Sequence, residues 1–474
     1  MPVFRYSPLD LSTDAIRLVR LCKDSFYNDI QCELVETFLR QVDRVPYDAL
    51  SYTWAGDPGG PSSDADAAQI TMNGKKVSVT GNLLSALRHL RSRSQDRMLW
   101  IDALCIDQAN DEEKGQQVGQ MRLVYQYADN VLIWLGLGSE DTDSSMEMMT
   151  MLDVRVMQRG DRHTRPLQVW YEEWFALRAE CGIHPQYSDR RLAAGLSDLL
   201  DRPWFQRVWV LQEVACARVA TVVCGVHSVS TRTFAMLPLV WGLEKVDPHV
   251  QAVLELMPGP MRRDSSGTES GDDDRTLATL LKKFEHSKAS VKLDRVYALL
   301  GISSDASDPD YFPPIYSLSE EEVVFNTMLF LVMGYTRHSI ENQRFGVPAD
   351  FSDARYLEMR GRRCTVTDLI QALKGPAPLW TYLLDWAVME HQDKLVARLV
   401  KGSRKTFETD LSALDVGAPI DTMPPLAHRV MADMVPRHVE MPAKEQTGGE
   451  DDALPVRPAG GASAQRGGQR RDNR

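Results

Sequence analysis

Two short apolar runs constrain the fold of this chain more than any other feature. MLWID, from Met98, and NVLIWLG, from Asn130, have the length and the aromatic and β-branched content of fully buried strands. Between them, Asn110 and Asp111 can begin a helix, and apolar residues recur on one face of it at Val118, Met121, Val124, Tyr125 and Ala128. Apolar strands separated by an amphipathic helix are typical of a parallel sheet covered on both faces. The pattern predicts an α/β fold with a mostly parallel sheet flanked by helices.

The segment before these strands adds a hairpin and a helix. YDALSYTW, at residues 47–54, has the composition of a strand. QITMNGKKVSV then places Asn73 and Gly74 between two alternating runs, which is a strong signal for a tight β-hairpin. In NLLSALRHLR, Asn82 can cap a helix whose apolar positions recur at helical spacing, at Leu83, Leu84, Leu87 and Leu90.

The segment after them predicts more helices and one more strand. Residues 139–200 have helical patterns, and Pro203 is well placed in the first turn of another helix. RVATVVCG, from Arg218, favours a strand. Beyond Val226 the patterns are mainly helical, so the sheet is expected to end here.

These patterns divide the chain into regions. The Gly, Ser and Asp content of residues 258–275 predicts a flexible loop. Two segments, from Leu383 and from Val416, resemble parts of ankyrin-type helical pairs, and plain helices are the alternative. The predicted regions are an N-terminal lead at 1–43, an α/β domain at 44–225, a helical extension at 226–345, a helical region at 346–443, for which degenerate ankyrin-like pairs are the less favoured interpretation, and a disordered tail at 444–474.

The composition of the chain limits the cellular environment and the kinds of partner that we expect for it. The chain has 474 residues, 43% of them hydrophobic, and can bury a large core. Its net charge of −12 argues against nucleic acid as a partner, although a local basic patch is compatible with that charge. Seven scattered cysteines without a C-x-x-C pair predict reduced thiols. The first residues show no basic segment that leads into an apolar run, so a secretory signal is not expected. The longest apolar stretch, residues 323–335, is shorter than the roughly 20 residues of a membrane span. We expect a soluble cytoplasmic protein without a membrane span.

The sequence lacks the motifs that serine hydrolases, zinc peptidases and P-loop proteins require. The chain has no G-x-S-x-G, H-E-x-x-H or G-x-x-x-x-G-K-[ST] sequence. GLGSED, from Gly136, is a partial dinucleotide fingerprint that more simply fits a strand-to-helix turn. Asp102 and Asp107 would face opposite sides of an extended chain, so hydrogen-bonded loop acids are favoured over a metal pair and no metal is predicted. Cys105 has no basic neighbour in sequence, which favours a buried thiol over a nucleophile.

Glu213 is the most informative polar residue. It lies between Leu211 and Val214 in RVWVLQEV, so partial burial would disfavour its charged form unless a donor pairs with it. Two interpretations stay open: a structural acid bound to an arginine such as Arg207 or Arg202, or the acid of a functional cleft.

The motifs together resemble a known family. YDALSYTWAGDP, WIDALCIDQANDEEKGQQVGQM, VYQYADNVLIWLG and RPWFQRVWVLQEVACA, in this order, resemble the heterokaryon incompatibility (HET) domain of filamentous fungi over about residues 44–225. KLDRVYALLGI, from Lys292, is similar to a segment that often follows that domain. One departure is visible, because Ala55 stands before Gly56 where the family usually has glycine directly after the tryptophan.

The resemblance implies a role and a site. The family is implicated in recognition of non-self nuclei after cell fusion and in the regulated cell death that follows. The domain is also distantly similar to Toll/interleukin-1 receptor (TIR) domains, in whose NAD-cleaving members the glutamate of W-x-L-x-E is catalytic. By this resemblance Glu213 in WVLQE is the catalytic acid. The residues implied to bind the ligand are Tyr52, Trp54, Asp102 and Trp209.

The same resemblance sets the remaining expectations. NAD is the implied substrate, no cofactor is expected, and activation is expected to need a protein partner or self-association. The alternative is a non-catalytic death-signalling module that binds partners. In either case, YDALSYTW and WIDALCIDQ are expected to be core strands whose carboxyl ends line one cleft together with the helix that holds Glu213.

Overall fold

The computed structural model describes nine ranges of the chain. They are residues 4–40, 45–54, 68–159, 167–181, 184–243, 245–261, 275–308, 312–333 and 365–374. The predicted disordered tail, the two ankyrin-like segments, Ala55 with Gly56, and most of the predicted loop at 258–275 lie outside these ranges.

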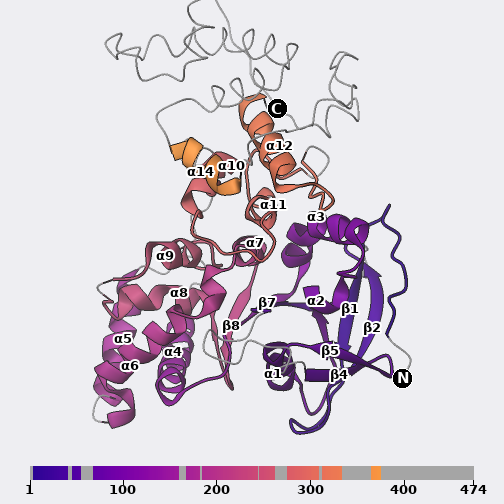
Figure 1. The fold of residues 1–474 in the computed structure, drawn as a ribbon. Coiled ribbons are helices and arrows are strands. Elements are labelled where there is room, and N and C mark those ends of the chain that lie inside the picture. Colours follow the sequence, from indigo (N-terminus) through magenta and orange to yellow (C-terminus); the bar gives the residue numbers. More distant parts are fainter. Residues whose placement is uncertain are drawn as a thin grey trace, which may run out of the picture. The chain divides into compact units, whose positions relative to one another are not determined.

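A nine-stranded mixed sheet forms the centre of the fold, in the order β5-β4-β2-β1-β6-β3-β7-β8-β9 (Figure 1). Its parallel core consists of β6 (Arg97–Trp100), β3 (Asp48–Ser51), β7 (Asn130–Trp134) and β8 (Ala220–Cys224). The predicted α/β fold is therefore confirmed. Antiparallel strands extend this core on both sides, and one of them, β9 (His227–Ser230), was not predicted.

The N-terminal lead contributes to the same sheet. β1 (Ala15–Leu21) pairs antiparallel with β2 (Gln31–Phe38) on one side and with β6 on the other. The predicted hairpin is confirmed as β4 (Ala68–Met72) and β5 (Lys75–Val79). Asn73 and Gly74 have φ angles of 48° and 73° in its turn, the left-handed conformation that these two residue types tolerate best.

The predicted cap of the next helix was wrong by two residues. Helix α1 (Gly81–Leu90) is capped by Thr80, whose hydroxyl accepts a hydrogen bond from the Leu83 amide at 3.2 Å. Asn82 lies inside the first turn and makes tertiary contacts instead. Its amide donates to the Thr53 carbonyl at 2.8 Å, and its oxygen accepts from Trp134 Nε1 at 2.8 Å.

The segment between β6 and β7 contains two helices. Asn110 caps α3 (Asp111–Tyr127) as predicted, and the predicted apolar stripe of α3 is buried. The extended conformation expected from Asp102 to Asp107 was wrong, because the short helix α2 (Asp102–Cys105) begins directly after β6.

The helices predicted between residues 139 and 200 are confirmed as α4 (Glu140–Gln158), α5 (Leu167–Cys181) and α6 (Asp189–Leu200). Pro203 begins a separate 3₁₀ turn, η3 (Pro203–Gln206), ahead of α7 (Trp209–Cys216). The later helices are α8 (Thr231–Val240), α9 (Pro248–Leu254), α10 (Leu277–Lys283), α11 (Asp294–Leu300), α12 (Glu320–Met333) and α14 (Val366–Lys374). None of the helices in the described ranges is long and apolar enough to span a bilayer.

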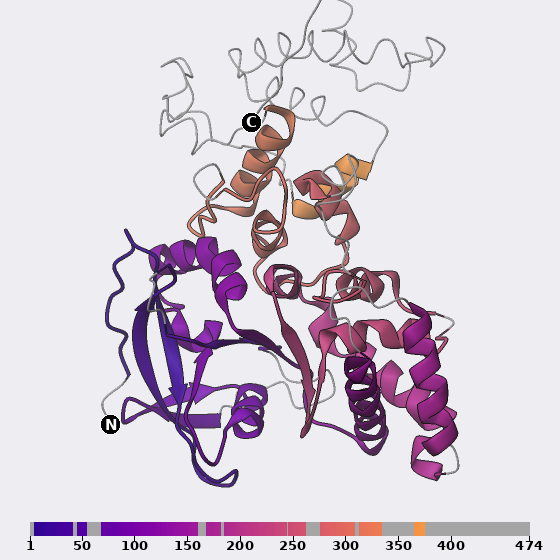
Figure 2. The ribbon, with the colours of Figure 1, turned by 180° about the vertical axis from the view of Figure 1, so that it is seen from behind.

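Side-chain contacts assign helices to the two faces of the sheet. Tyr125 of α3 packs edge-on against Trp100 of β6, with ring centroids 5.4 Å apart. On the opposite face, His89 of α1 packs against Trp134 of β7 at 5.1 Å. Figures 1 and 2 show α3 and α7 on one side of the strands and α1 on the other. The carboxyl ends of β3 and β6 therefore open toward residues carried by α2, α3 and α7.

Candidate functional site

Glu213 lies on α7 and faces the carboxyl end of β3. Its side chain accepts a hydrogen bond from the hydroxyl of Ser51, the last residue of that strand. Trp204 Nε1 donates to the same hydroxyl at 2.8 Å. Glu213 is only 1% exposed, and Ser51 and Trp204 are equally buried. The acid therefore belongs to a dehydrated polar cluster that joins residues 162 positions apart in sequence.

This burial places the titration of Glu213 near neutral pH. Removal from water raises its pKa to about 7, against the opposing effects of the Arg207 charge and the Ser51 hydrogen bond. The two arginines that the sequence suggested as partners of Glu213 make other contacts. The Arg207 guanidinium donates to the Tyr52 carbonyl, and Arg202 pairs with Asp198 at 3.0 Å. The protonated and ionised forms of Glu213 are therefore both expected near neutral pH.

The strand ends meet as the sequence predicts. Trp54, just after β3, donates through Nε1 to Asp102 Oδ2 at 2.9 Å, and Asp102 begins α2 directly after β6. Burial raises the pKa of Asp102, while the Arg207 charge, the Ala103 amide and Trp54 lower it. Tyr52 is 2% exposed and Trp54 is 39% exposed. Trp54 is therefore the solvent-exposed member of this group, whereas Tyr52 and Glu213 are buried.

Trp209 points to a different partner. Its Nε1 donates to Asp294 Oδ2 at 3.0 Å, and the Tyr316 hydroxyl donates to Asp294 Oδ1 at 2.8 Å. Asp294 begins α11 and belongs to the KLDRVYALLGI segment. Among the residues predicted to bind a ligand, Trp209 therefore joins α7 to α11 through a hydrogen bond between the two helices.

The other candidates of the sequence have structural partners. Cys105 is fully buried, as predicted, and burial raises the pKa of its thiol to about 12. Asp107 accepts a hydrogen bond from the Ala109 amide at 3.1 Å. Glu113, which the sequence did not single out, pairs with Arg17 of β1 at 2.6 Å in a buried salt bridge. Within the described ranges, no three His, Cys, Asp or Glu residues gather in a way that could hold a metal ion.

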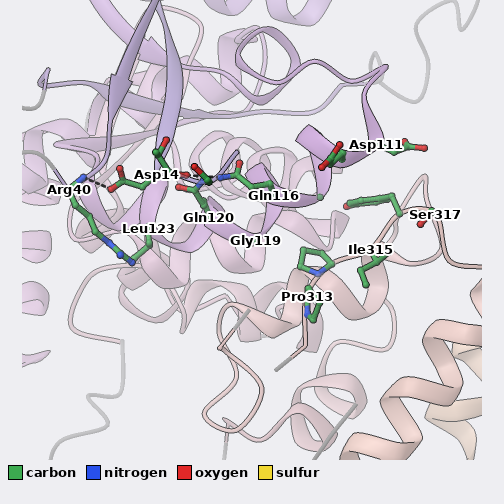
Figure 3. A pocket seen from close by; sticks show the side chains of 16 residues that line it. Asp14, Arg40, Asp111, Gln116, Gly119, Gln120, Leu123, Pro313, Ile315 and Ser317 are labelled. Carbon is green, nitrogen blue, oxygen red and sulfur yellow. Dashed lines mark hydrogen bonds between the residues drawn. The ribbon is translucent and has the colours of Figure 1, made fainter. Parts of the chain in front are cut away.

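Three cavities among the described residues lie away from Glu213. One of about 1000 Å³ separates α3 from residues 313–317 and from the loop that leads into β1 (Figure 3). Gln120 lines this cavity, and its side-chain amide has no hydrogen-bond partner in the described structure. Others, of about 710 and 490 Å³, are also lined by residues outside the Glu213 cluster. Glu213 itself is 1% exposed and lines none of these three cavities.

Comparison with known proteins agrees with this architecture. Residues 47–213 match the model of the family described as "Heterokaryon incompatibility protein (HET)", so the chain contains a HET domain. The hydrogen bond between Ser51 and Glu213 joins the two ends of this matched region.

One curated relative extends the similarity beyond that domain. The chain is 27% identical over 357 residues to "Heterokaryon incompatibility protein 6, OR allele" of Neurospora crassa. The alignment covers 65% of this chain and 51% of the relative, so the chain spans about half the length of that protein. No solved structure matches the chain significantly.

Proposed function

We propose that this chain acts in fungal heterokaryon incompatibility and in the regulated cell death linked to it, and that its HET domain hydrolyses NAD with Glu213 as catalytic residue. The family match and the name of the curated relative support the first part. One observation carries the second. Glu213, with a pKa of about 7, is held by Ser51 at the carboxyl ends of parallel strands, where ligands of open α/β sheets bind.

The reaction needs an acid with these properties. Hydrolysis breaks the bond between the nicotinamide nitrogen and ribose C1′, and the bonding electrons leave with nicotinamide. Positive charge then develops on the sugar, and a carboxylate beside it lowers the energy of this state. Water supplies the hydroxyl at C1′ and releases its second proton. The products are nicotinamide and ADP-ribose.

The neighbouring residues have matching roles. Asp102 lies within reach of the strand-end cluster and can accept hydrogen bonds from ribose hydroxyls. The exposed ring of Trp54 offers an apolar surface for the nicotinamide ring. Tyr52 supports the floor of the site, and its carbonyl positions Arg207. Trp209 acts indirectly, by anchoring α7 to α11 through Asp294.

The closed arrangement fits a domain that is activated by association. Glu213 is 1% exposed, whereas Trp54, which donates to Asp102, is 39% exposed. A protein partner, or a second copy of the chain, that displaces Trp54 would open the path to Glu213. Activity is therefore expected from assembled protein and not from the isolated closed chain.

The test is Glu213→Gln in the full chain, which keeps the shape of the side chain and removes its charge. NAD consumption is expected to fall by about a hundredfold, the usual effect of one electrostatic contact in a transition state. Glu36→Gln is the matched control, because Glu36 is exposed on β2. The comparison is made on assembled protein, under conditions in which the wild-type chain consumes NAD, and equal NAD turnover by a folded Glu213→Gln variant there would refute the catalytic assignment.

A second candidate function is a death-signalling module without chemistry. The complete burial of Glu213 beneath Ser51 and Trp204 favours it, since such a cluster can serve packing alone. Expression of the full chain in a host cell, with viability and NAD followed together, separates the two functions. Cell death without NAD loss, retained in the Glu213→Gln variant, would support the signalling module.

A further inference from the structure

The cavity of about 710 Å³ is a groove on the face of the sheet opposite Glu213. It is formed by the end of α1, the loop at residues 26–27, strands β7 and β8, and the turn at 225–228. Its charged lining residues are all basic or histidine. They are Arg88, His89, Arg91, Arg93, Arg97 and His227. No aspartate or glutamate lines the groove, although the whole chain has a net charge of −12.

Two of these arginines have protein partners. Arg91 is buried and donates to the carbonyls of Ser25, Phe26, Asn28 and Asp29. Arg97 lies 3.6 Å from the carboxylate of Asp48. Of these two arginines, Arg91 donates to carbonyl groups and Arg97 lies beside a carboxylate, so the positive charge of the groove is only partly balanced.

Arg88 and Arg93 are not compensated in this way. Within the described ranges, neither forms an ion pair or a hydrogen bond, and Arg88 Nε is buried without a partner. Burial lowers the pKa of Arg91, and the nearby positive charge of Arg88 lowers it further, against the opposite effect of Asp24. Like charges gathered around a groove repel each other, and a bound anion relieves that repulsion.

The rim of the groove adds aromatic and apolar surface. Tyr27 is 86% exposed and packs edge-on against Phe26, with ring centroids 5.4 Å apart. Val226, from the turn after β8, is 81% exposed. Exposed apolar side chains beside arginines form the combination that binds an aromatic base and a phosphate in one ligand.

We propose that this groove is a nucleotide-binding site. Arg88 and Arg93 hold the phosphate groups through charge-assisted hydrogen bonds, and the base packs against Tyr27 and Val226. The cavity of about 710 Å³ is within the range of small-molecule sites. A long nucleic acid is disfavoured, because the acidic remainder of the chain would repel its further phosphates.

This site is distinct from the proposed catalytic centre. His89 and Arg88 belong to α1, which packs on the Trp134 face of the sheet, whereas Glu213 packs on the Ser51 face. Arg97 and Asn130 also stand at the starts of β6 and β7, and Ser51 stands at the end of β3. The proposal therefore holds whether or not Glu213 cleaves NAD.

The experiment measures binding of ADP, pyrophosphate and adenosine to the full wild-type chain by titration calorimetry at low salt. ADP is expected to bind more tightly than either part alone. Arg88→Gln and, separately, Arg93→Gln should each weaken ADP and pyrophosphate by about tenfold or more, as expected for hydrogen bonds to charged groups. Tyr27→Ala should weaken ADP but not pyrophosphate. Arg190→Gln, at an exposed position on α6, is the control for loss of one positive charge and should bind as wild type.

The choice of variants keeps the result interpretable. Arg93 is exposed and makes no described contact, so its replacement should not disturb folding even if that of Arg88 does. Equal affinity of wild type and Arg93→Gln for ADP, or no saturable binding of ADP and pyrophosphate, would overturn the proposal. Tighter binding of a 20-nucleotide single strand than of ADP, lost in Arg93→Gln, would also overturn it, in favour of a nucleic-acid surface.

Discussion

The buried carboxyl group of Glu213 makes the stability of the chain depend on pH in a defined direction. Its pKa is about 7 in the folded chain and 4.5 for an unperturbed side chain, because burial disfavours the charged form. Between these values the folded state binds the proton more tightly than the unfolded state does. The free energy of unfolding therefore falls as pH rises through this window, by about 1.4 kcal/mol per unit of pKa shift, or roughly 3 kcal/mol in total.

Glu213→Gln removes this contribution, because glutamine does not titrate. Urea unfolding of the full wild-type and variant chains at pH 5, 6, 7 and 8 measures the difference. Relative to wild type, the variant should gain roughly 2 to 3 kcal/mol between pH 5 and pH 8, since part of the shift already lies below pH 5. All other titrating groups cancel in this comparison, and exposed Glu36→Gln should follow wild type. Parallel stability curves for wild type and Glu213→Gln would refute the assignment of a raised pKa to Glu213.

Other parts of the structure support further predictions. If Glu213 acts as a carboxylate, kcat/KM for NAD should rise with pH to a plateau with an apparent pKa near 7, and a flat profile would contradict this. Ser51→Ala removes a hydrogen bond that lowers the pKa of Glu213, so the same profile should move to higher pH; a shift to lower pH would count against that role. Arg17→Gln leaves Glu113 buried without its partner and should cost about 3 to 5 kcal/mol in urea unfolding, whereas a loss below 1 kcal/mol would show that the pair is dispensable. Trp100→Ala should cost a similar amount, about 3 to 5 kcal/mol, because Trp100 is completely buried against Tyr125; wild-type stability would argue against this packing.

Local chemistry explains which elements were predictable from sequence. The hairpin depends on Asn73 and Gly74, two residue types that tolerate the positive φ angles of its turn better than others do. The start of α3 depends on Asn110, which caps the backbone next to it. The cap of α1 was missed because Thr80 and Asn82 are both good capping residues. Trp134, far away in sequence, engages the side chain of Asn82 and leaves the cap to Thr80.

In the candidate site, too, contacts between residues far apart in sequence could not be predicted. Glu213 was singled out by the resemblance of WVLQE to the TIR motif, and its role stays a prediction. The strand ends were enough to predict that Trp54 and Asp102 lie together. The role of Ser51 was not predictable, because it depends on β3 lying beneath α7. The orientation of Trp209 was missed for a similar reason, since its partner Asp294 lies 85 positions away.

The contact between α7 and α11 makes the region after the HET domain relevant to the candidate site. Asp294 binds Trp209 at the first residue of α7, and Gly301, just after α11, lies so close to Gln212 that a Cβ atom there would collide with its side-chain amide. Gln212 is the direct neighbour of Glu213, so α11 restrains the helix turn that holds the acid. A fragment of residues 1–230 lacks this restraint, and loss of NAD cleavage in such a fragment would not by itself bear on Glu213. Asp294→Asn in the full chain separates the effect of the α7–α11 contact from that of Glu213. It keeps α11 and Glu213 in place and changes only the acceptor of Trp209 and Tyr316.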